Sequence, residues 1–383
     1  MVHPLDDLSA DWAASSEKWT RYPGKIGAFV AEMDFGTAPP VTAALLRAVE
    51  RGELGYVSRR VAEEMSRATA GWMLREYGWA VEQDRVRPVG DVLAGLQATI
   101  EHFTTPGSPV IVPTPAYMPF LTLPPVLGRE VLEVPLRVVD GRYVHDLQAL
   151  DAAFSAGGEL LVLCNPHNPT GRVFDRDELL AVAELVARHG GRVFADEIHA
   201  PLVGPGRRHL PYADVSPVAA GHTITATSAS KAWNMPGLKC GQLVLTADAD
   251  LERWDAVGGR TQNLTGTLGA IAATVAYDQG REWLAEVKQY LRGNGTLLRR
   301  LLAERLPEVG HIPPEGTYLA WLDCRTLGLT SPQEFFLHEA DVALTDGAAC
   351  GRAGRGFVRL NFALPRPLLE QAVERMAGAL ARR

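Results

Sequence analysis

Three short motifs contain the residues of this chain that are best suited to chemistry. Lys231 ends the run Ser-Ala-Ser-Lys at 228–231, Asp196 follows an apolar stretch, and Asn168 stands in the turn Asn-Pro-His-Asn-Pro-Thr-Gly at 165–171. A lysine amine can form an imine with an aldehyde and can then act as a base. A carboxylate beside a basic ring nitrogen keeps that nitrogen protonated, so the ring can accept electrons. The three motifs therefore indicate chemistry on an amino group, assisted by a carbonyl cofactor.

The order of these motifs resembles that of the pyridoxal-phosphate enzymes of the class I/II aminotransferase superfamily, which have PLP fold type I. The resemblance implies that Lys231 bonds pyridoxal 5'-phosphate, that Asp196 pairs with its pyridine nitrogen and that Asn168 donates to its phenolic oxygen. His199 stands where many aminotransferases place a tyrosine on the same oxygen. A metal site built from Asp196, Glu197 and His199 is disfavoured, because no further ligand stands at a suitable spacing.

Four residues are expected to hold the cofactor phosphate from the same chain. Ser228 offers a hydroxyl group, and Lys239 takes the place of the usual arginine, losing its forked geometry but keeping its charge. The amides of Asp91 and Val92 precede a helical pattern, where they would face an anion. In that arrangement the side chain of Asp91 must point away from the phosphate.

Three further positions follow from the same resemblance. Tyr117, in a proline-rich loop, is expected to stack on the cofactor ring. Arg359, in the strand-like run Phe-Val-Arg-Leu, is expected to bind a substrate α-carboxylate by two parallel hydrogen bonds. Tyr56 is expected to reach a phosphate across a dimer interface, and it joins Lys231 and Asp196 in the predicted catalytic set.

Several longer segments resemble one branch of the superfamily, the bacterial cystathionine β-lyases. These segments are Lys18-Trp19, 29–35, 196–199, 230–234, 237–240 and 315–321. Phe29 and Glu32 depart from the Trp and Asp that are usual in the arm over the substrate pocket, and both are assigned to substrate binding. The resemblance implies a carbon–sulfur β-lyase that converts an S-substituted L-cysteine to a thiol, pyruvate and ammonia by α,β-elimination.

Two related functions and one unrelated function remain open beside this prediction. An aminotransferase would use the same named residues, so only His199, Lys239 and the arm favour the lyase. A specialised enzyme of the branch could act on a larger S-conjugated amino acid. A transcriptional regulator with this fold would need a DNA-binding domain, and no basic helix-turn-helix pattern precedes the fold.

The elements that must position these residues follow an α/β rhythm. Continuous apolar runs at 110–112, 160–163, 192–195, 223–226 and 242–245 alternate with helical patterns such as 175–189. This rhythm predicts a large domain with a mostly parallel sheet flanked by helices, and a smaller α+β domain. The predicted boundaries are 1–45 for an irregular N-terminal arm that joins the small domain, 46–279 for the large PLP-binding domain and 280–383 for the small domain. A long helix is predicted over 278–306, with a possible interruption at 293–295.

Composition restricts the partners and the cellular compartment. The 383 residues are 46% hydrophobic and 22% charged, with a net charge of −7 and no long basic run, which argues against a nucleic-acid partner. No secretory signal and no membrane-spanning run is apparent. Four scattered cysteines are typical of reduced thiols, and no metal is expected. The glycine run 351–356 lacks the dinucleotide pattern and is expected to form a loop. We expect a cytoplasmic homodimer that takes a small amino-acid substrate, with shared active sites and no membrane partner.

Overall fold

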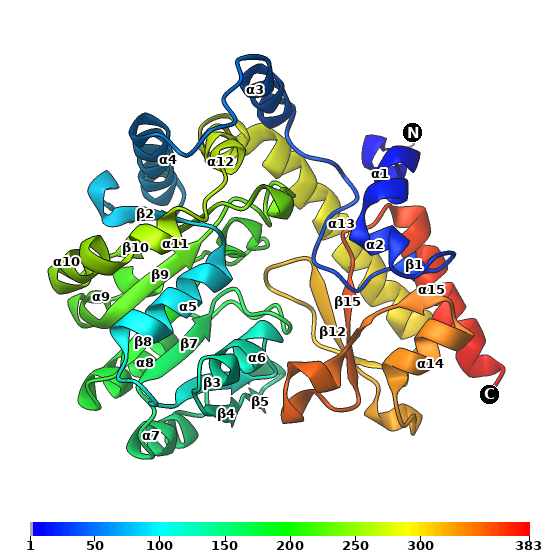
Figure 1. The fold of residues 1–383 in the computed structure, drawn as a ribbon. Coiled ribbons are helices and arrows are strands. Elements are labelled where there is room, and N and C mark those ends of the chain that lie inside the picture. The colour runs from blue at the N-terminus through cyan, green and yellow to red at the C-terminus, as the bar shows by residue number, and fades with distance from the viewer. Residues whose placement is uncertain (1–2) are drawn as a thin grey trace.

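The computed structural model describes residues 3–383, and a seven-stranded sheet forms the centre of its larger half (Figure 1). In spatial order, the strands are β2 (Val86–Val89), β10 (Gly241–Leu245), β9 (Thr223–Thr227), β8 (Arg192–Asp196), β7 (Leu160–Cys164), β3 (Val110–Thr114) and β4 (Val131–Pro135). Only β10 runs antiparallel to its neighbours; the other pairs are parallel. The predicted α/β class with a mostly parallel sheet is confirmed.

Both faces of this sheet are covered, which explains why its central strands read as continuous apolar runs. Along β7, Leu160 and Val162 belong to one core, whereas Leu161 and Leu163 belong to the core on the other face. The first core includes α5 (Val92–Phe103), α6 (Pro119–Val126) and α10 (Asp248–Val257). The second includes α7 (Leu147–Ser155), α8 (Arg176–Arg188) and α9 (Pro217–His222).

The remaining elements of the larger half lie at its edges. Helices α3 (Pro39–Glu50), α4 (Arg59–Trp72) and α12 (Thr267–Gln279) pack together beside β2 and β10, and the short α11 (Gly259–Gln262) follows α10. Strands β5 (Arg137–Val139) and β6 (Arg142–Val144) form a separate hairpin. Among residues 3–383, no helix is both long enough and apolar enough to cross a bilayer.

A four-stranded antiparallel sheet forms the smaller half. Its order is β11 (Gly310–His311), β12 (Leu319–Asp323), β15 (Phe357–Asn361) and β14 (Thr345–Asp346), and α14 (Pro332–Glu339) and α15 (Arg366–Ala381) accompany it. Helix α13 (Arg281–Arg305) extends from beside α12 into this half (Figure 1). The interruption expected at 293–295 is absent from α13, because Asn294 is buried there and donates to the carbonyls of Phe362 and Leu364 at 2.9 and 2.8 Å.

The N-terminal arm joins the smaller half. Strand β1 (Ile26–Gly27) pairs in parallel with β13 (Val342–Ala343). The arm is less irregular than the sequence predicted, since it contains α1 (Ala10–Ser15) and α2 (Glu17–Thr20). Ser9 caps the first of these helices by accepting a hydrogen bond from the Trp12 amide. The arm therefore lies beside the small sheet and passes over the ends of the large-sheet strands.

Candidate active site

One cavity of about 560 Å³ lies between the two halves, at the carboxyl ends of the parallel strands, where α/β folds commonly bind ligands. It brings together ten of the residues named from the sequence, from segments far apart in the chain. They are Phe29, Asp91, Val92, Tyr117, Asn168, Asp196, His199, Lys231, Lys239 and Arg359. Glu32, Tyr56 and Ser228 do not line it.

Lys231 enters the cavity from the turn that follows β9. Its Nζ donates a hydrogen bond to the carbonyl oxygen of Ala31 at 2.9 Å. Burial, and then the positive charge of Arg359, lower the pKa of Lys231 to about 8. An amine of this kind is partly neutral near neutral pH, as a nucleophile or a base must be.

Asp196 ends β8 and is almost completely buried. Its Oδ1 accepts a hydrogen bond from the Ile198 amide at 3.0 Å, and its Oδ2 lies 3.9 Å from the Cys164 thiol. Burial raises the pKa of Asp196 to about 7, and the Glu197 carboxylate adds to the rise. A cationic group next to Asp196 would stabilise its ionised form.

Arg359 lies in β15 and is 2% exposed. Its guanidinium donates to Asn168 Oδ1 at 2.9 Å, to the Phe29 carbonyl at 2.9 Å and to Thr345 Oγ1 at 3.1 Å, all of them neutral acceptors. Within residues 3–383 it makes no ion pair, and its Nε has no hydrogen-bond partner. A buried cation without a counter-ion is costly, so Arg359 is suited to bind an anionic group of a ligand.

His199 is buried beside these groups and remains neutral. Burial, followed by the charges of Lys231 and Arg359, lowers the pKa of His199 to about 3. Its Nδ1 has no partner among the described residues, and its ring meets Tyr318 edge-on with centroids 6.0 Å apart. Tyr318 also donates to the Ala31 carbonyl at 2.9 Å, so this carbonyl accepts from both Tyr318 and Lys231.

Another part of the cavity lining combines Lys239 with the start of α5. Asp91 caps this helix by accepting from the Ala94 amide at 2.8 Å, and its other oxygen pairs with Lys239 Nζ at 3.0 Å. Asp91 is among the lining residues, and its side chain caps α5 because the free amides of the first turn require an acceptor. Its position relative to a bound phosphate stays a prediction. Ser228 lies outside the wall, where it donates to the Cys240 carbonyl at 2.7 Å, and Ser230 takes its place in the lining.

The aromatic residue predicted to stack, Tyr117, also faces this space. It is mostly buried, which raises its pKa, and its ring meets Phe120 edge-on with centroids 5.4 Å apart.

The donor set fits pyridoxal phosphate. The cavity offers an amine of lowered pKa, a buried carboxyl group that forms no ion pair within residues 3–383, and a lysine beside a helix start. It also contains buried nitrogen atoms of His199 and Arg359 that have no partner within residues 3–383.

A buried ion pair fixes the arm over the cavity. Lys18 Nζ lies 2.9 Å from Asp34 Oδ2, both side chains are fully buried, and the indoles of Trp12 and Trp19 each donate to Asp34 Oδ1 at 3.0 Å. Lys18 also donates to the carbonyls of Glu32 and Ala363. This cluster holds the arm so that the Ala31 carbonyl meets Lys231. The sequence drew attention to Lys18-Trp19 only as a family likeness, not as an anchor.

Two predicted residues stand apart from the lining for different reasons. Glu32 is half-buried at the edge, where burial raises the pKa of its carboxyl group and the charge of Lys231 opposes the rise. Tyr56 is 95% exposed, so any role in a site depends on a second chain. Other lining residues, Arg21, Tyr22 and Thr345, were not predicted, because no motif distinguishes them in the sequence.

The groups considered for metal binding do not converge. Glu197 points away from the cavity, where it accepts from the Tyr212 amide at 2.7 Å and contacts His209 Nε2 at 2.9 Å. Within residues 3–383, no cluster of three His, Cys, Asp or Glu side chains could hold a metal ion.

Comparisons with known proteins show which family and which solved structures the whole chain is similar to. Residues 26–376 match the family model of class I and II aminotransferases. The chain is 40% identical over 370 residues to cystathionine β-lyase of Corynebacterium glutamicum, which covers 95% of this chain and 96% of the relative. It is 33% identical to cystathionine β-lyase PatB of Bacillus subtilis, over 92% of each chain. The crystal structure of cystalysin from Treponema denticola, which contains pyridoxal 5'-phosphate, superposes with a TM-score of 0.93 at 28% identity over 100% of both chains.

Proposed function

The chain belongs to the family of class I and II aminotransferases, and from that premise we propose that it is a pyridoxal-phosphate-dependent carbon–sulfur β-lyase. Its reaction is α,β-elimination of an S-substituted L-cysteine to a thiol, pyruvate and ammonia. The main observation in favour of an amino-acid substrate is that Lys231 and Arg359, which forms no ion pair within residues 3–383, line the same cavity. Full-length likeness to cystathionine β-lyases favours elimination over transamination.

Pyridoxal phosphate, when bound, supplies an aldehyde for amines and a ring that withdraws electrons from the substrate Cα. In this chain Lys231 would bond it, Asp196 would face its ring nitrogen, and Asn168 and His199 would contact its phenolic oxygen. Tyr117 would stack on its ring. Lys239, Ser230 and the amides of Asp91 and Val92 would hold its phosphate, with Ser228 supporting that turn from behind.

The protein groups divide the reaction between them. Arg359 binds the substrate α-carboxylate, which aligns the Cα–H bond with the Lys231 amine. Lys231, whose pKa lies near 8, removes the Cα proton. The electron pair left at Cα then expels the thiolate from Cβ, and the thiolate takes up a proton. The 2-aminoacrylate that is released reacts with water to give pyruvate and ammonia. Phe29, in the arm, would contact the sulfur substituent of the substrate, and Glu32, which does not line the cavity, would meet only a substituent that extends beyond it.

The first test measures pyruvate release from L-cystathionine by the cofactor-loaded protein, with the visible spectrum followed in the same cuvette. We expect multiple turnovers of pyruvate and an unchanged visible band at the end. Stoichiometric loss of the band without pyruvate would indicate an aminotransferase and overturn the proposal. If pyruvate is released only from larger S-conjugated amino acids, the β-lyase reaction still holds and the protein is a specialised enzyme of this kind.

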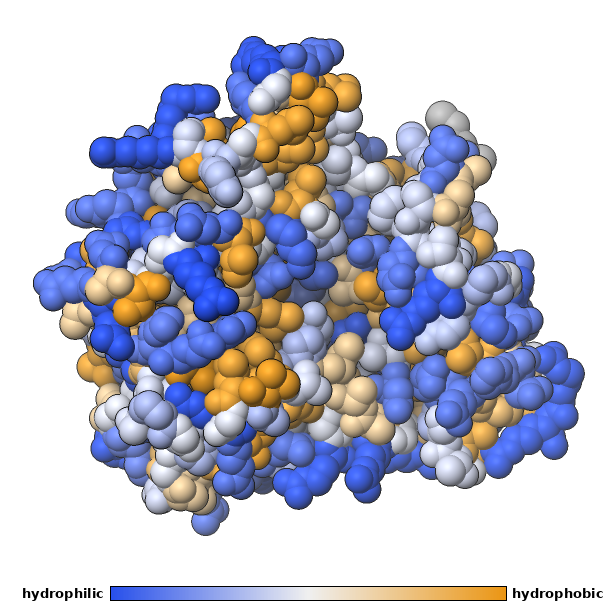
Figure 2. Space-filling model, viewed as in Figure 1, coloured by the Kyte–Doolittle hydropathy of each residue, from blue (hydrophilic) through white to orange (hydrophobic). Residues whose placement is uncertain are grey.

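We also propose that the protein is a homodimer in which Tyr56 contacts the cofactor phosphate of the partner subunit. The exposed residues Leu46, Val49, Leu54, Tyr56 and Leu264 carry large apolar groups, and hydrophobic residues gather over α3 at the top of Figure 2. A second copy would cover this face. Light scattering should give twice the chain mass, and a monomer would contradict the proposal.

Mixing two defective variants tests whether active sites are shared. Tyr56→Ala and Lys231→Ala are each expected to be nearly inactive. After the variants are mixed and allowed to exchange subunits, a hybrid dimer contains one site with both residues intact. Restored activity would support shared sites, whereas additive residual activity would exclude them.

Two further proposals concern organisation and compartment. We propose domain boundaries at 45/46 and 279/280, supported by the change from the seven-stranded to the four-stranded sheet and by the β1–β13 pairing of the arm. We propose a cytoplasmic location, because all four cysteines are buried and unpaired, as is common in reducing compartments.

A further inference from the structure

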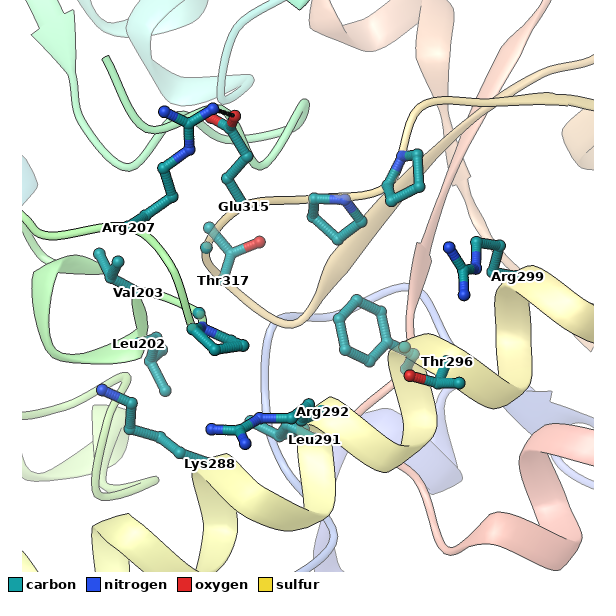
Figure 3. A pocket seen from close by; sticks show the side chains of 17 residues that line it. Leu202, Val203, Arg207, Lys288, Leu291, Arg292, Thr296, Arg299, Glu315 and Thr317 are labelled. Atoms are coloured by element: carbon teal, nitrogen blue, oxygen red, sulfur yellow. Dashed lines mark ion pairs between the residues drawn. The ribbon is translucent and has the colours of Figure 1, made fainter. Parts of the chain in front are cut away.

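A second hollow, of about 490 Å³, lies between α13 and two loops and shares no lining residue with the active cavity. Figure 3 shows its walls. Lys288, Arg292, Thr296 and Arg299 project from α13, Arg207 comes from the loop after β8, and Glu315 and Thr317 come from the loop before β12. We call this hollow the α13 groove. Its volume suits a small molecule.

The α13 groove has an excess of positive charge. Lys288, Arg292 and Arg299 are spaced by four and seven residues, so they share one face of the helix. None of these three cations forms an ion pair within residues 3–383. The only acidic residue in the lining, Glu315, is already used: it pairs with Arg207 at 2.7 Å and with Arg172 at 2.7 Å.

This arrangement differs from that of α4, whose arginines are paired. On α4, Arg59 and Arg60 each pair with the acid four residues later, in Arg59–Glu63 and Arg60–Glu64, both at 2.7 Å. Arg67 pairs with Asp278 at 2.6 Å.

On the groove face of α13, no acidic residue within Arg281–Arg305 pairs with Lys288, Arg292 or Arg299. Burial lowers the pKa of Lys288, and the neighbouring charge of Arg292 lowers it further, although Glu76 opposes both. The cations of the groove therefore repel one another, and Glu76, the acid whose charge acts on Lys288, already pairs with Arg281 at 3.1 Å.

The floor of the α13 groove is apolar. Leu202, Val203, Leu291 and Phe362 are buried there, and Pro313 and Pro314 also line the groove. Apolar walls lower the local dielectric constant and strengthen the field of the cations above them. A ligand with several negative charges could pack against this apolar surface and pair with the cations of α13.

We propose that the α13 groove binds a small molecule that carries two or more anionic groups, such as a diphosphate or a tricarboxylate. Arg292, Arg299 and Lys288 contact the anionic groups, and the apolar floor contacts the remainder. The bound molecule bridges α13 to the loop that holds Arg207. That loop is joined to the loop before β12 by a hydrogen bond from the Gly204 amide to the Glu315 carbonyl at 2.8 Å.

The test titrates cofactor-loaded protein with inorganic pyrophosphate and, separately, with citrate, by calorimetry at constant ionic strength. Loaded protein is used so that the cofactor phosphate fills the phosphate end of the active cavity. We expect saturable binding at one site per chain by at least one probe. The stronger probe distinguishes a phosphate ligand from a carboxylate ligand. Binding should also raise the melting temperature, since the ligand stabilises the folded state.

Two double variants make the assignment specific. In Arg292→Gln/Arg299→Gln, the affinity should fall at least tenfold. In the matched control Arg300→Gln/Arg305→Gln, which removes two exposed arginines of α13 outside the groove lining, it should stay within twofold. Absence of saturable binding would overturn the proposal. Equal losses of affinity in both double variants would also overturn it. Unchanged binding in the groove variant would overturn it too, and would assign the anion to Arg359 instead.

Discussion

Two buried cations, one in the arm and one in the active cavity, have opposite surroundings. Lys18 faces the carboxylate of Asp34, which two indoles also hold. Arg359 is equally buried but meets only an amide oxygen, a hydroxyl group and a backbone carbonyl. A buried charge needs compensation, and in the arm the protein supplies it. In the cavity the compensating anion is expected to arrive with the substrate, so the missing partner marks a binding position.

Lys231 is a third amine or guanidinium group for this comparison. Its pKa is lowered, so it can lose its proton and need not remain in the cavity as an unpaired charge. Replacing it with alanine should give the largest effect, a loss of turnover of at least about 10⁴-fold. The visible band of the cofactor-loaded protein should vanish as well. Pyruvate assays and absorbance spectra measure the two effects.

Lys25→Ala provides the control, since Lys25 pairs with Asp341 near the surface of the smaller half. Its turnover should stay within about twofold, as expected for a surface ion pair. If Lys231→Ala kept substantial lyase activity, the proposed base would be wrong.

Arg359→Gln tests the unpaired cation. Loss of the charged contact to the substrate carboxylate should lower kcat/KM by about 10²- to 10³-fold, chiefly through KM. Stability should not fall, because the substitution removes a buried charge that has no counter-ion. Steady-state kinetics and urea unfolding measure both effects. Arg352→Gln, at an exposed neighbouring turn, should change neither. A large loss of stability in Arg359→Gln with an unchanged KM would reverse the interpretation of this residue.

Asp34→Asn tests the paired cation and should have the reverse pattern. It leaves Lys18 buried without its anion, so the free energy of unfolding should fall by about 3 kcal/mol. Asp341→Asn, which weakens the exposed pair with Lys25, should cost about 0–1 kcal/mol. Urea unfolding of both variants gives the comparison. Equal costs would mean that burial does not distinguish the two pairs.

The sequence predicted the sheet, its helices and ten of the 24 residues that line the cavity, because each depends on local patterns. Apolar runs reveal strands covered on both faces, and the motifs around Asn168, Asp196 and Lys231 each follow the end of one strand. Charge pairing across distant segments leaves no such local pattern. The Lys18–Asp34 pair joins residues 16 apart, and Lys239 meets Asp91 across 148 positions.

The omissions and errors of prediction have a similar origin. The sequence did not reveal that the carboxylate of Asp91 accepts from an amide of α5 and so stays at the helix start. Asn294 between two glycines suggested a break in α13, but its hydrogen bonds to the chain after β15 hold the helix intact. In both cases a hydrogen-bond requirement determined the local structure.

The smallest predicted effect is a change in the titration of Lys231, measured in cofactor-free protein as the pH dependence of the rate of cofactor capture. A pKa of about 8 leaves roughly a tenth of the amine neutral at pH 7, whereas an ordinary lysine would be almost entirely charged. The capture rate should therefore rise with pH and level off above about pH 8. Stopped-flow absorbance of the visible band gives this midpoint.

Two substitutions should move the midpoint in opposite directions. Arg359→Gln removes a repelling positive charge, so the pKa of Lys231 rises and capture shifts to higher pH. Glu32→Gln removes a negative charge that favours the ammonium form, so the pKa falls and capture shifts to lower pH. Each shift should be less than about one pH unit, because burial is the larger cause and both variants retain it. Titrations of the cofactor itself are common to all variants and cancel in the comparison. Shifts of the same sign, or a midpoint near the ordinary lysine value, would contradict the assignment of Lys231 as an amine whose charge Arg359 disfavours.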